Sequence, residues 1–146
     1  MFLTTKALIL RETKYKESDK ILTLLTEHEG KMTAKARGVL RPKSKLSSAV
    51  QLFSYSEVTM FGSNGRWTVN EASTVEEFRG LRTDIKNFAM AGYFSEMLEA
   101  VSDEDFPNPS ILQLGLNSLY ALANGLFDSN IIKAVFELRL AGYAGY

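Results

Sequence analysis

The chain has 146 residues, of which 45% are hydrophobic and 23% are charged, a balance typical of one or two small globular domains rather than a disordered chain. It contains no cysteine, which excludes a disulfide framework and a metal site built from thiolates. The opening segment MFLTTKALILRETKY lacks the long apolar core of a signal peptide or a membrane span, so we expect a cytoplasmic protein.

Charge is unevenly distributed along the chain, although 17 basic and 17 acidic residues cancel in total. Residues 1 to 80 carry thirteen lysines and arginines against nine acids, whereas residues 81 to 146 carry four against eight. The net charges of the two parts are therefore +4 and −4. A basic first half is joined to an acidic second half.

The first half of the chain is expected to form strands. Gly30 favours a tight turn after the second apolar run, and Asn64 with Gly65 is a strong signal for a two-residue hairpin turn. The polar residues 11–19 predict an exposed loop between the first two strands. The strands are predicted over residues 6–10, 20–26, 31–37, 52–61 and 66–75. Such a series of short strands indicates a small barrel or sandwich.

The third predicted strand alternates between apolar and basic residues. Met32, Ala34 and Ala36 fall on one face, which we expect to be core. The other face carries cations that continue into the loop RPKSK, and no acidic residue occurs from residue 30 to residue 56. This basic stripe comprises Lys31, Lys35, Arg37, Arg41, Lys43 and Lys45. Because such a cluster attracts phosphate groups through counterion release, it is a candidate nucleic-acid surface.

Further residues are candidates for the same surface. Arg66 lies beside the predicted hairpin turn, and Arg11, Lys14 and Lys16 lie in the first predicted loop. Tyr15 lies in that loop too, and it is the aromatic side chain that we expect to stack on bases. The other aromatic residues of the strands are expected to be mostly core, because a small barrel must be filled, and the alternative for one or two of them on the basic face is stacking on bases. These other aromatic residues are Phe53, Tyr55, Phe61 and Trp67.

The second half of the chain is expected to form three helices, separated by FPNP at residues 106–109 and by Gly125. The first begins at about Glu76, the second at about Ser110, and the third at Asp128 or Ser129. The buried stripe of the first helix is expected to contain Leu81, Ile85, Phe88, Ala89, Gly92 and Met97. The buried stripe of the second helix is expected to contain Ile111, Leu112, Leu119 and Leu122. The buried stripe of the third helix is expected to contain Ile132, Val135, Phe136 and Leu140.

The first predicted helix has more apolar residues than one stripe requires. Phe94, Leu98 and Val101 lie beside Tyr93 and Met97 on its surface. We expect these residues to pack on the strands, and the alternative is a groove for a partner's peptide. Because strands and helices are segregated along the chain, the predicted fold class is α+β.

Motifs for catalysis are weak. His28 is the only histidine, and it falls between two glutamates in a predicted turn, where we expect a solvated side chain rather than a catalytic base. The acids at residues 76–77 lie near a predicted helix start, where they favour the helix dipole, and those at residues 103–105 lack the spacing of a calcium loop. GSNGR lacks the P-loop pattern and reads as a hairpin turn. We therefore expect no enzymatic activity, no metal and no cofactor.

Three segments of the chain together resemble a known family. They are ESDKILTLLTEHEGKMTAKARGVLRPKSKLSSAVQLFS at residues 17–54, EEFRGLR at residues 76–82 and FELRL at residues 136–140. In this order they closely resemble the bacterial RecO family of recombination mediators and DNA repair proteins. The resemblance follows the family's order across nearly the whole chain. One departure is Leu52, where the family is expected to have a proline.

The resemblance implies an OB-fold over residues 1–78 followed by an α-helical domain over residues 79–146. It implies a non-enzymatic function at the nucleoid: binding single- and double-stranded DNA, annealing complementary strands, and acting with RecR to load RecA. RecA would be loaded onto DNA coated by the single-stranded-DNA-binding protein, whose acidic C-terminal tail the helical domain would receive. The residues that stand in the family's basic segment are Lys35, Arg37, Arg41, Lys43 and Lys45.

Two other functions are compatible with the same residues. An RNA-binding OB module of the translation machinery needs an equally basic groove. A protein-interaction scaffold uses its cations to bind an acidic partner. Competition between RNA and DNA oligonucleotides separates the first of these from DNA binding, and binding to an acidic peptide without binding to nucleic acid identifies the second.

Overall fold

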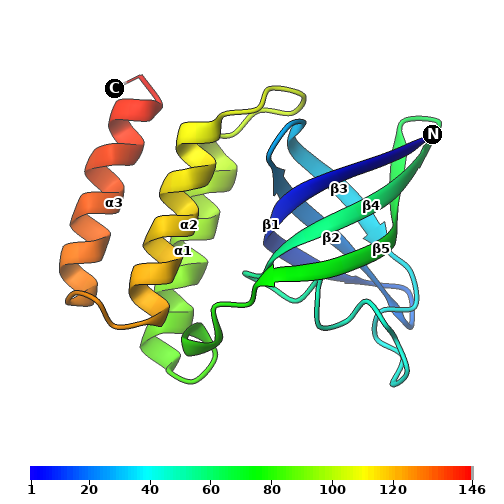
Figure 1. Ribbon diagram of the computed structural model, residues 1–146, viewed down its shortest axis with the longest axis horizontal. Helices are drawn as coiled ribbons and strands as arrows, with labels where there is room; N and C mark the ends of the chain where they lie inside the picture. Colours follow the sequence, from blue (N-terminus) through cyan, green and yellow to red (C-terminus); the bar gives the residue numbers. More distant parts are fainter. Residues whose placement is uncertain (146) are drawn as a thin grey trace.

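The computed structural model describes residues 1–145 and places a five-stranded barrel beside a group of helices (Figure 1). The strands are β1 (Phe2–Tyr15), β2 (Asp19–Thr26), β3 (Gly30–Ala36), β4 (Tyr55–Ser63) and β5 (Arg66–Glu76). The helices are the short 3-10 helix η1 (Arg79–Leu81), α1 (Ile85–Val101), α2 (Pro109–Ala123) and α3 (Ser129–Tyr143). The barrel closes in the order β1-β2-β3-β5-β4, as in an OB-fold. The predicted α+β class and the OB-fold are confirmed.

Strand β1 is longer than the sequence predicted. Residues 11–15, which were expected in a loop, pair with β2 from Arg11 opposite Thr23 to Tyr15 opposite Asp19. The pairing register shifts between Ile9 and Arg11, which marks a β-bulge. Residues 11–15 are polar and mostly exposed, so apolar patterning did not reveal them as a strand. The loop is reduced to a turn at residues 16–18.

The other strand boundaries follow from turn residues that the sequence identified. Asn64 and Gly65 connect β4 to β5 with φ angles of 54° and 75°, as a two-residue hairpin turn requires. Gly30 has a φ angle of 73° at the start of β3. The predicted hairpin and the predicted turn are both confirmed.

Helix α1 begins later than predicted and buries a different face. Strand β5 runs to Glu76 and η1 follows it, so the helix starts only after Asp84, whose carboxylate accepts hydrogen bonds from the backbone N–H groups of Lys86 and Asn87. Ile85 is 90% exposed and Phe88 is also exposed, so the predicted stripe was wrong there. The buried residues of α1 are Ala91, Phe94, Ser95 and Leu98.

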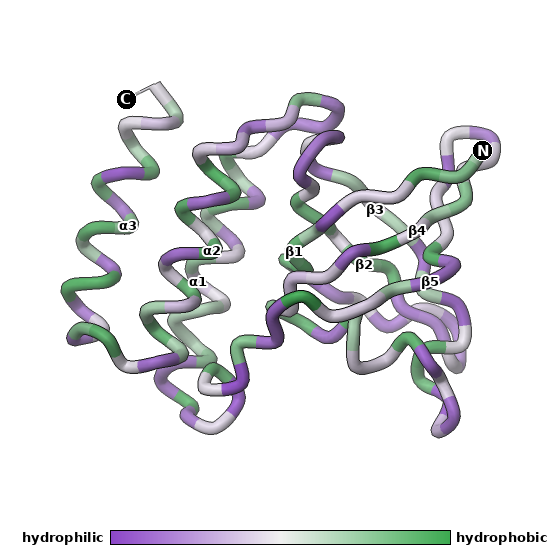
Figure 2. Tube along the Cα trace, viewed as in Figure 1, coloured by the Kyte–Doolittle hydropathy of each residue, from purple (hydrophilic) through white to green (hydrophobic). Residues whose placement is uncertain are grey.

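Helices α2 and α3 agree more closely with the prediction. Asn108 caps α2, and Gly125, with a φ angle of 60°, follows its end. Asp128 caps α3 by accepting a hydrogen bond from the backbone N–H of Asn130. The predicted inward residues of both helices are buried except Val135, which is exposed. Along α2 and α3 in Figure 2, hydrophobic and hydrophilic residues alternate, as expected for helices with one buried face.

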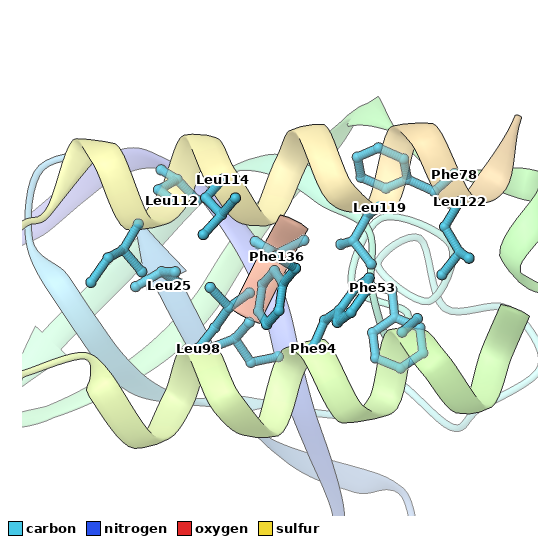
Figure 3. Packing of buried hydrophobic residues seen from close by; sticks show 14 of the residues in the cluster. Leu25, Phe53, Phe78, Phe94, Leu98, Leu112, Leu114, Leu119, Leu122 and Phe136 are labelled. Carbon is cyan, nitrogen blue, oxygen red and sulfur yellow. The ribbon is translucent and has the colours of Figure 1, made fainter. Parts of the chain in front are cut away.

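The barrel and the helices share one hydrophobic core. Leu8 and Leu25 of the barrel are buried in the same cluster as Phe94 and Leu98 of α1 and Phe136 of α3. Figure 3 shows this cluster between α1 and α2, and the rings of Phe94 and Phe136 stack with their centroids 4.2 Å apart. A second cluster fills the barrel interior. Phe94 and Leu98 are thus buried in the core that the strands share, as predicted. Their neighbours Tyr93, Met97 and Val101 instead line a hollow of about 200 Å³ between α1 and α3, as in the alternative.

Arg82, in the EEFRGLR segment, fastens the connection between the barrel and α1. Its guanidinium donates hydrogen bonds to the backbone oxygens of Glu77, Phe78 and Leu52 and to the hydroxyl of Ser54. Burial lowers the pKa of the Arg82 guanidinium from its ordinary value, and the negative charge of Glu77 opposes this effect. Arg82 thus joins the residues that follow β5 to those that precede β4, which a lysine with a single ammonium cannot do.

Across residues 1–145, no helix combines the length and the apolar composition that crossing a membrane requires.

Candidate nucleic-acid interface

A groove of about 480 Å³ lies on the barrel, where β1, β2, β3 and the hairpin of β4 and β5 come together. Three residues predicted from the sequence line it: Tyr15, Lys35 and Arg66. They are separated by up to 51 positions in the chain, and the closure of the barrel brings them together. The groove therefore brings together three of the residues predicted to bind nucleic acid, and the others do not line it.

The pairing of the strands explains which side chains form the groove. Phe61 of β4 pairs with Thr68 of β5, Thr68 pairs with Lys35 of β3, and Lys35 pairs with Ile21 of β2. Directly paired residues point to the same face of a sheet, so these side chains form one row across four strands. Their neighbours Met60, Ala34 and Leu22 are buried inside the barrel, so the row lies on its outer face.

Tyr15 lies at one side of the groove, at the end of β1 rather than in the predicted loop. Its side chain is 39% exposed. The ammonium groups of Lys16 and Lys35 lie 5.3 Å and 5.4 Å from the centroid of its ring, within the range of a cation–π interaction. Two cations therefore lie within interaction range of the ring, and the ring remains partly accessible to solvent.

The loop after β3 carries the remaining predicted cations. Its start is fastened to the turn after β1, because the backbone N–H of Gly38 donates to Asp19 Oδ1 at 2.7 Å and that of Leu40 donates to the Ser18 carbonyl at 2.9 Å. The Arg41 side chain packs beside Gly38. Arg37, Arg41, Lys43 and Lys45 are all exposed.

We define the basic surface as Lys35, Arg37, Arg41, Lys43, Lys45 and Arg66. Within residues 1–145, none of these six forms an ion pair with a carboxylate. By contrast, Arg11, Lys20, Arg79 and Lys133 each pair with a glutamate. The basic surface thus presents positive charge that no side chain of the described residues neutralises, which is the arrangement that attracts phosphate.

Lys31 and Arg11 do not join the basic surface, contrary to expectation. Lys31 Nζ donates to the backbone oxygen of Glu99 at 3.2 Å, and the Arg11 guanidinium makes two hydrogen bonds, of 3.1 Å and 3.0 Å, with the Glu99 carboxylate. Lys31 stands four residues before Lys35, which places the two about 13 Å apart along the strand. Both Lys31 and Arg11 instead connect the barrel to the last turns of α1, where helix carbonyls favour cations.

Two aromatic residues of the groove, Phe61 and Trp67, were expected to be mostly core. Phe53 is indeed fully buried, but Phe61 is 43% exposed. The alternation in β4 already indicates that Phe61 is exposed. Phe61 and the exposed Glu57 lie on one face of the strand, and the buried Val58 and Met60 lie on the other.

Other sequence-predicted positions lie away from the groove. His28 is exposed in the turn between β2 and β3, as predicted. The acidic residues 103–105 belong to the connection between α1 and α2, where the backbone oxygen of Asp103 accepts a hydrogen bond from the Lys31 N–H at 3.1 Å. No group of three or more metal-ligating side chains is assembled in the part of the chain that the structure describes.

A second hollow, of about 630 Å³, lies between α2 and α3. Its lining is mainly apolar and includes Leu114, Phe127, Ile131 and Val135, and Arg139 contributes a cation. Phe127 and Ile131 are more than half exposed, so this side of the helices presents an apolar surface to solvent.

Comparison with known proteins agrees with this architecture. Residues 1–78 match the family model described as "Recombination protein O N terminal", and residues 82–146 match the one described as "Recombination protein O C terminal". The two models together cover nearly the whole chain, and their division falls at the short segment between β5 and α1.

Curated proteins named "DNA repair protein RecO" are similar over the same length. The protein from Acetivibrio thermocellus is 35% identical over 145 residues, which cover 99% of this chain and 58% of that protein. The protein from Listeria monocytogenes is 34% identical over 140 residues, which cover 96% of this chain and 54% of that protein. The protein from Alkaliphilus metalliredigens is 35% identical over 145 residues, which cover 99% of this chain and 59% of that protein. The chain spans somewhat more than half the length of these relatives, and it belongs to the RecO family.

Proposed function

We propose that this chain is a DNA-binding part of a recombination mediator that acts in DNA repair. The observation that carries the proposal is the basic surface of an OB-fold: six cations that form no ion pair within residues 1–145, two of which, Lys35 and Arg66, line the groove. Membership of the RecO family and the name of the curated relatives support the repair role.

DNA phosphates are proposed to follow the basic surface from Arg66 and Lys35 to Arg37 and the loop after β3. Cations that contact phosphate fix the position of the strand but do not read its sequence. Binding to both single- and double-stranded DNA with little base preference follows from such contacts. By family analogy, the complete function includes annealing of complementary strands and, with RecR, loading of RecA onto DNA coated by the single-stranded-DNA-binding protein.

Titration of a labelled single-stranded oligonucleotide at several salt concentrations tests the proposed DNA path. If all six cations of the basic surface contact phosphate, log K falls with log salt at a slope of roughly −4. Replacing Arg37, Arg41 and Lys43 by alanine together removes three of these contacts. The slope should then flatten to about −2, and affinity at low salt should fall.

The matched control is a triple variant of equal charge change outside the barrel, with Arg79, Lys86 and Lys133 replaced by alanine. We expect it to keep the wild-type slope, because these residues lie on η1, α1 and α3. Equally weak binding by the wild type and both variants at low salt would contradict the proposal. Stronger binding to RNA than to DNA of the same sequence would favour the translation alternative, and binding only to an acidic peptide would favour the scaffold.

The hollow between α2 and α3 is proposed to receive the acidic C-terminal tail of the single-stranded-DNA-binding protein. An apolar lining with one cation suits a peptide that carries acidic residues and ends in apolar ones. We expect Arg139→Glu to weaken binding of a labelled peptide of this kind about tenfold, because attraction becomes repulsion. Fluorescence anisotropy measures the affinity.

Lys86→Glu is the control for the peptide measurement, since it changes the charge equally at an exposed position of α1 outside the hollow. It should leave peptide affinity within about twofold of the wild type, as expected for a surface charge remote from the site. If both variants lose peptide affinity equally, the loss is caused by the change in net charge, and the hollow is not the peptide site.

A further inference from the structure

Two exposed aromatic rings lie at the rim of the barrel beside the groove. Phe2 of β1 is 63% exposed and Phe61 of β4 is 43% exposed, and the two residues are directly paired in the sheet. Their ring centroids lie 5.1 Å apart in an edge-to-face arrangement. Neither ring belongs to the buried clusters of the barrel or of the helices. An exposed pair of this kind marks an interaction surface rather than core packing.

Phe61 lines the same groove as Tyr15, together with small polar residues. The groove is lined by Phe61 and Tyr15, and Thr33 and Thr68 contribute hydroxyl groups to it. Because Phe61, Thr68 and Lys35 are successive partners across β4, β5 and β3, the backbones of β4 and β3 are about 10 Å apart at this level. Flat aromatic rings and hydroxyl groups in one groove match a nucleobase, which has apolar faces and polar edges.

The cations of the groove indicate which class of ligand binds beside the aromatic rings. Lys35 and Arg66 line the same groove and form no ion pair within residues 1–145. A purely apolar ligand would leave both charges beside it without a partner, whereas a nucleic-acid strand supplies phosphates for the cations and bases for the rings. The charge of the groove therefore favours a nucleic acid over an apolar protein segment.

We propose that Phe61, supported edge-on by Phe2, stacks on an unpaired base, and that this contact makes the groove prefer single-stranded over double-stranded DNA. The inference rests on the proposed DNA-binding function and adds the residue that distinguishes the two forms. In a duplex each base is already stacked between its neighbours, so only its edges are accessible. In a single strand the face of a base is available for stacking on an aromatic side chain.

The test compares three ligands of equal length: oligothymidylate, the same sugar-phosphate strand without bases, and a duplex. Trp67 is the only tryptophan and lines the groove, so its fluorescence reports occupancy of the groove by each ligand. For the wild type we expect oligothymidylate to bind about tenfold more tightly than the strand without bases. Phe61→Thr, which keeps a residue suited to strands, should remove that advantage and leave the salt slope and the duplex affinity unchanged.

Val75→Thr is the matched control, because Val75 is an exposed apolar residue of β5 outside the groove. It should leave all three affinities unchanged. Phe2→Thr provides a second variant, and its loss for oligothymidylate should be smaller than that of Phe61→Thr, since Phe2 acts through Phe61. The melting temperature of each variant checks that the barrel remains folded.

The possible failures separate the inference from the function on which it rests. Salt-dependent binding with equal affinity for oligothymidylate and for the strand without bases overturns base stacking and leaves the DNA-binding function intact. Equal losses for all three ligands in a folded Phe61→Thr variant also overturn the inference, because Phe61 then only shapes the surface. Absence of salt-dependent binding to any ligand overturns the proposed function itself.

Discussion

Replacing Phe94 by alanine is expected to lower the free energy of unfolding by about 3–5 kcal/mol, the usual cost of removing a fully buried phenylalanine. Phe94 stacks on Phe136, and the cluster that contains both rings also contains Leu8 and Leu25 of the barrel. The loss should therefore destabilise the barrel and the helices together. Denaturant unfolding followed by Trp67 fluorescence and by far-ultraviolet circular dichroism measures the two parts, and the two transitions should coincide.

The control for this variant lies on the same helix. Ile85 is 90% exposed, so Ile85→Ala should change the free energy of unfolding by no more than about 0.5 kcal/mol. Had Ile85 been part of the buried stripe, as its spacing predicted, the loss would be several times larger. If Phe94→Ala shifts the dichroism transition but not the Trp67 transition, the barrel and the helices unfold independently, and the shared core does not couple them.

Replacing Gly80 by alanine is expected to lower the free energy of unfolding by about 3 kcal/mol, at the upper end of the usual cost of overpacking. A Cβ atom at this position would lie 1.9 Å from the backbone oxygen of Ala123 at the end of α2. Backbone cannot move aside as a flexible side chain does, so η1 and α2 would have to separate. Thermal or denaturant unfolding measures the loss.

Gly92→Ala is the matched control, since it makes the same change at a helical position where an added Cβ meets nothing within 4 Å. It should raise the free energy of unfolding by roughly 0.5–1 kcal/mol, because alanine favours helix over glycine. Opposite signs for the two variants are the expected result. A Gly80→Ala variant as stable as the wild type would contradict the prediction, because η1 and α2 would then have moved apart without any loss in the free energy of unfolding.

Three residues of the EEFRGLR segment, Gly80, Leu81 and Arg82, explain why it is suited to its place. Gly80 permits close approach to α2, Arg82 binds backbone oxygens on both sides of the junction, and Leu81 is fully buried. The segment therefore holds the barrel against the helices. Its contribution to function is indirect, through the position of the parts it joins.

Much of the fold could be predicted from local patterns. The alternation of Met32, Ala34 and Ala36 with polar residues identified a strand, because a strand with one buried face must alternate. Asn64 with Gly65 identified the hairpin, because that turn requires positive φ angles. Asp128 and Ser129, both capping residues before an apolar run, located the start of α3 to within one residue, and the structure shows Asp128 as the cap. Each of these features depends only on residues close together in the chain.

Features that depend on distant residues were missed or misplaced. The outer part of β1, from Arg11 to Tyr15, is a strand because β2 supplies hydrogen-bond partners, and its own residues are polar. The buried face of α1 depends on where β5 and η1 end. The prediction started the helix at about Glu76, and it therefore placed the wrong residues on the buried face.

The candidate site shows the same division. The sequence alone predicted a cluster of cations and an aromatic residue as candidates for binding, because charge and composition can be read without knowing the fold. Only the tertiary structure assigned Lys31 and Arg11 to the contact with Glu99 and brought Tyr15, Lys35 and Phe61 to one groove. Strand pairing and barrel closure decide which side chains are neighbours, and these contacts join residues that no local pattern relates.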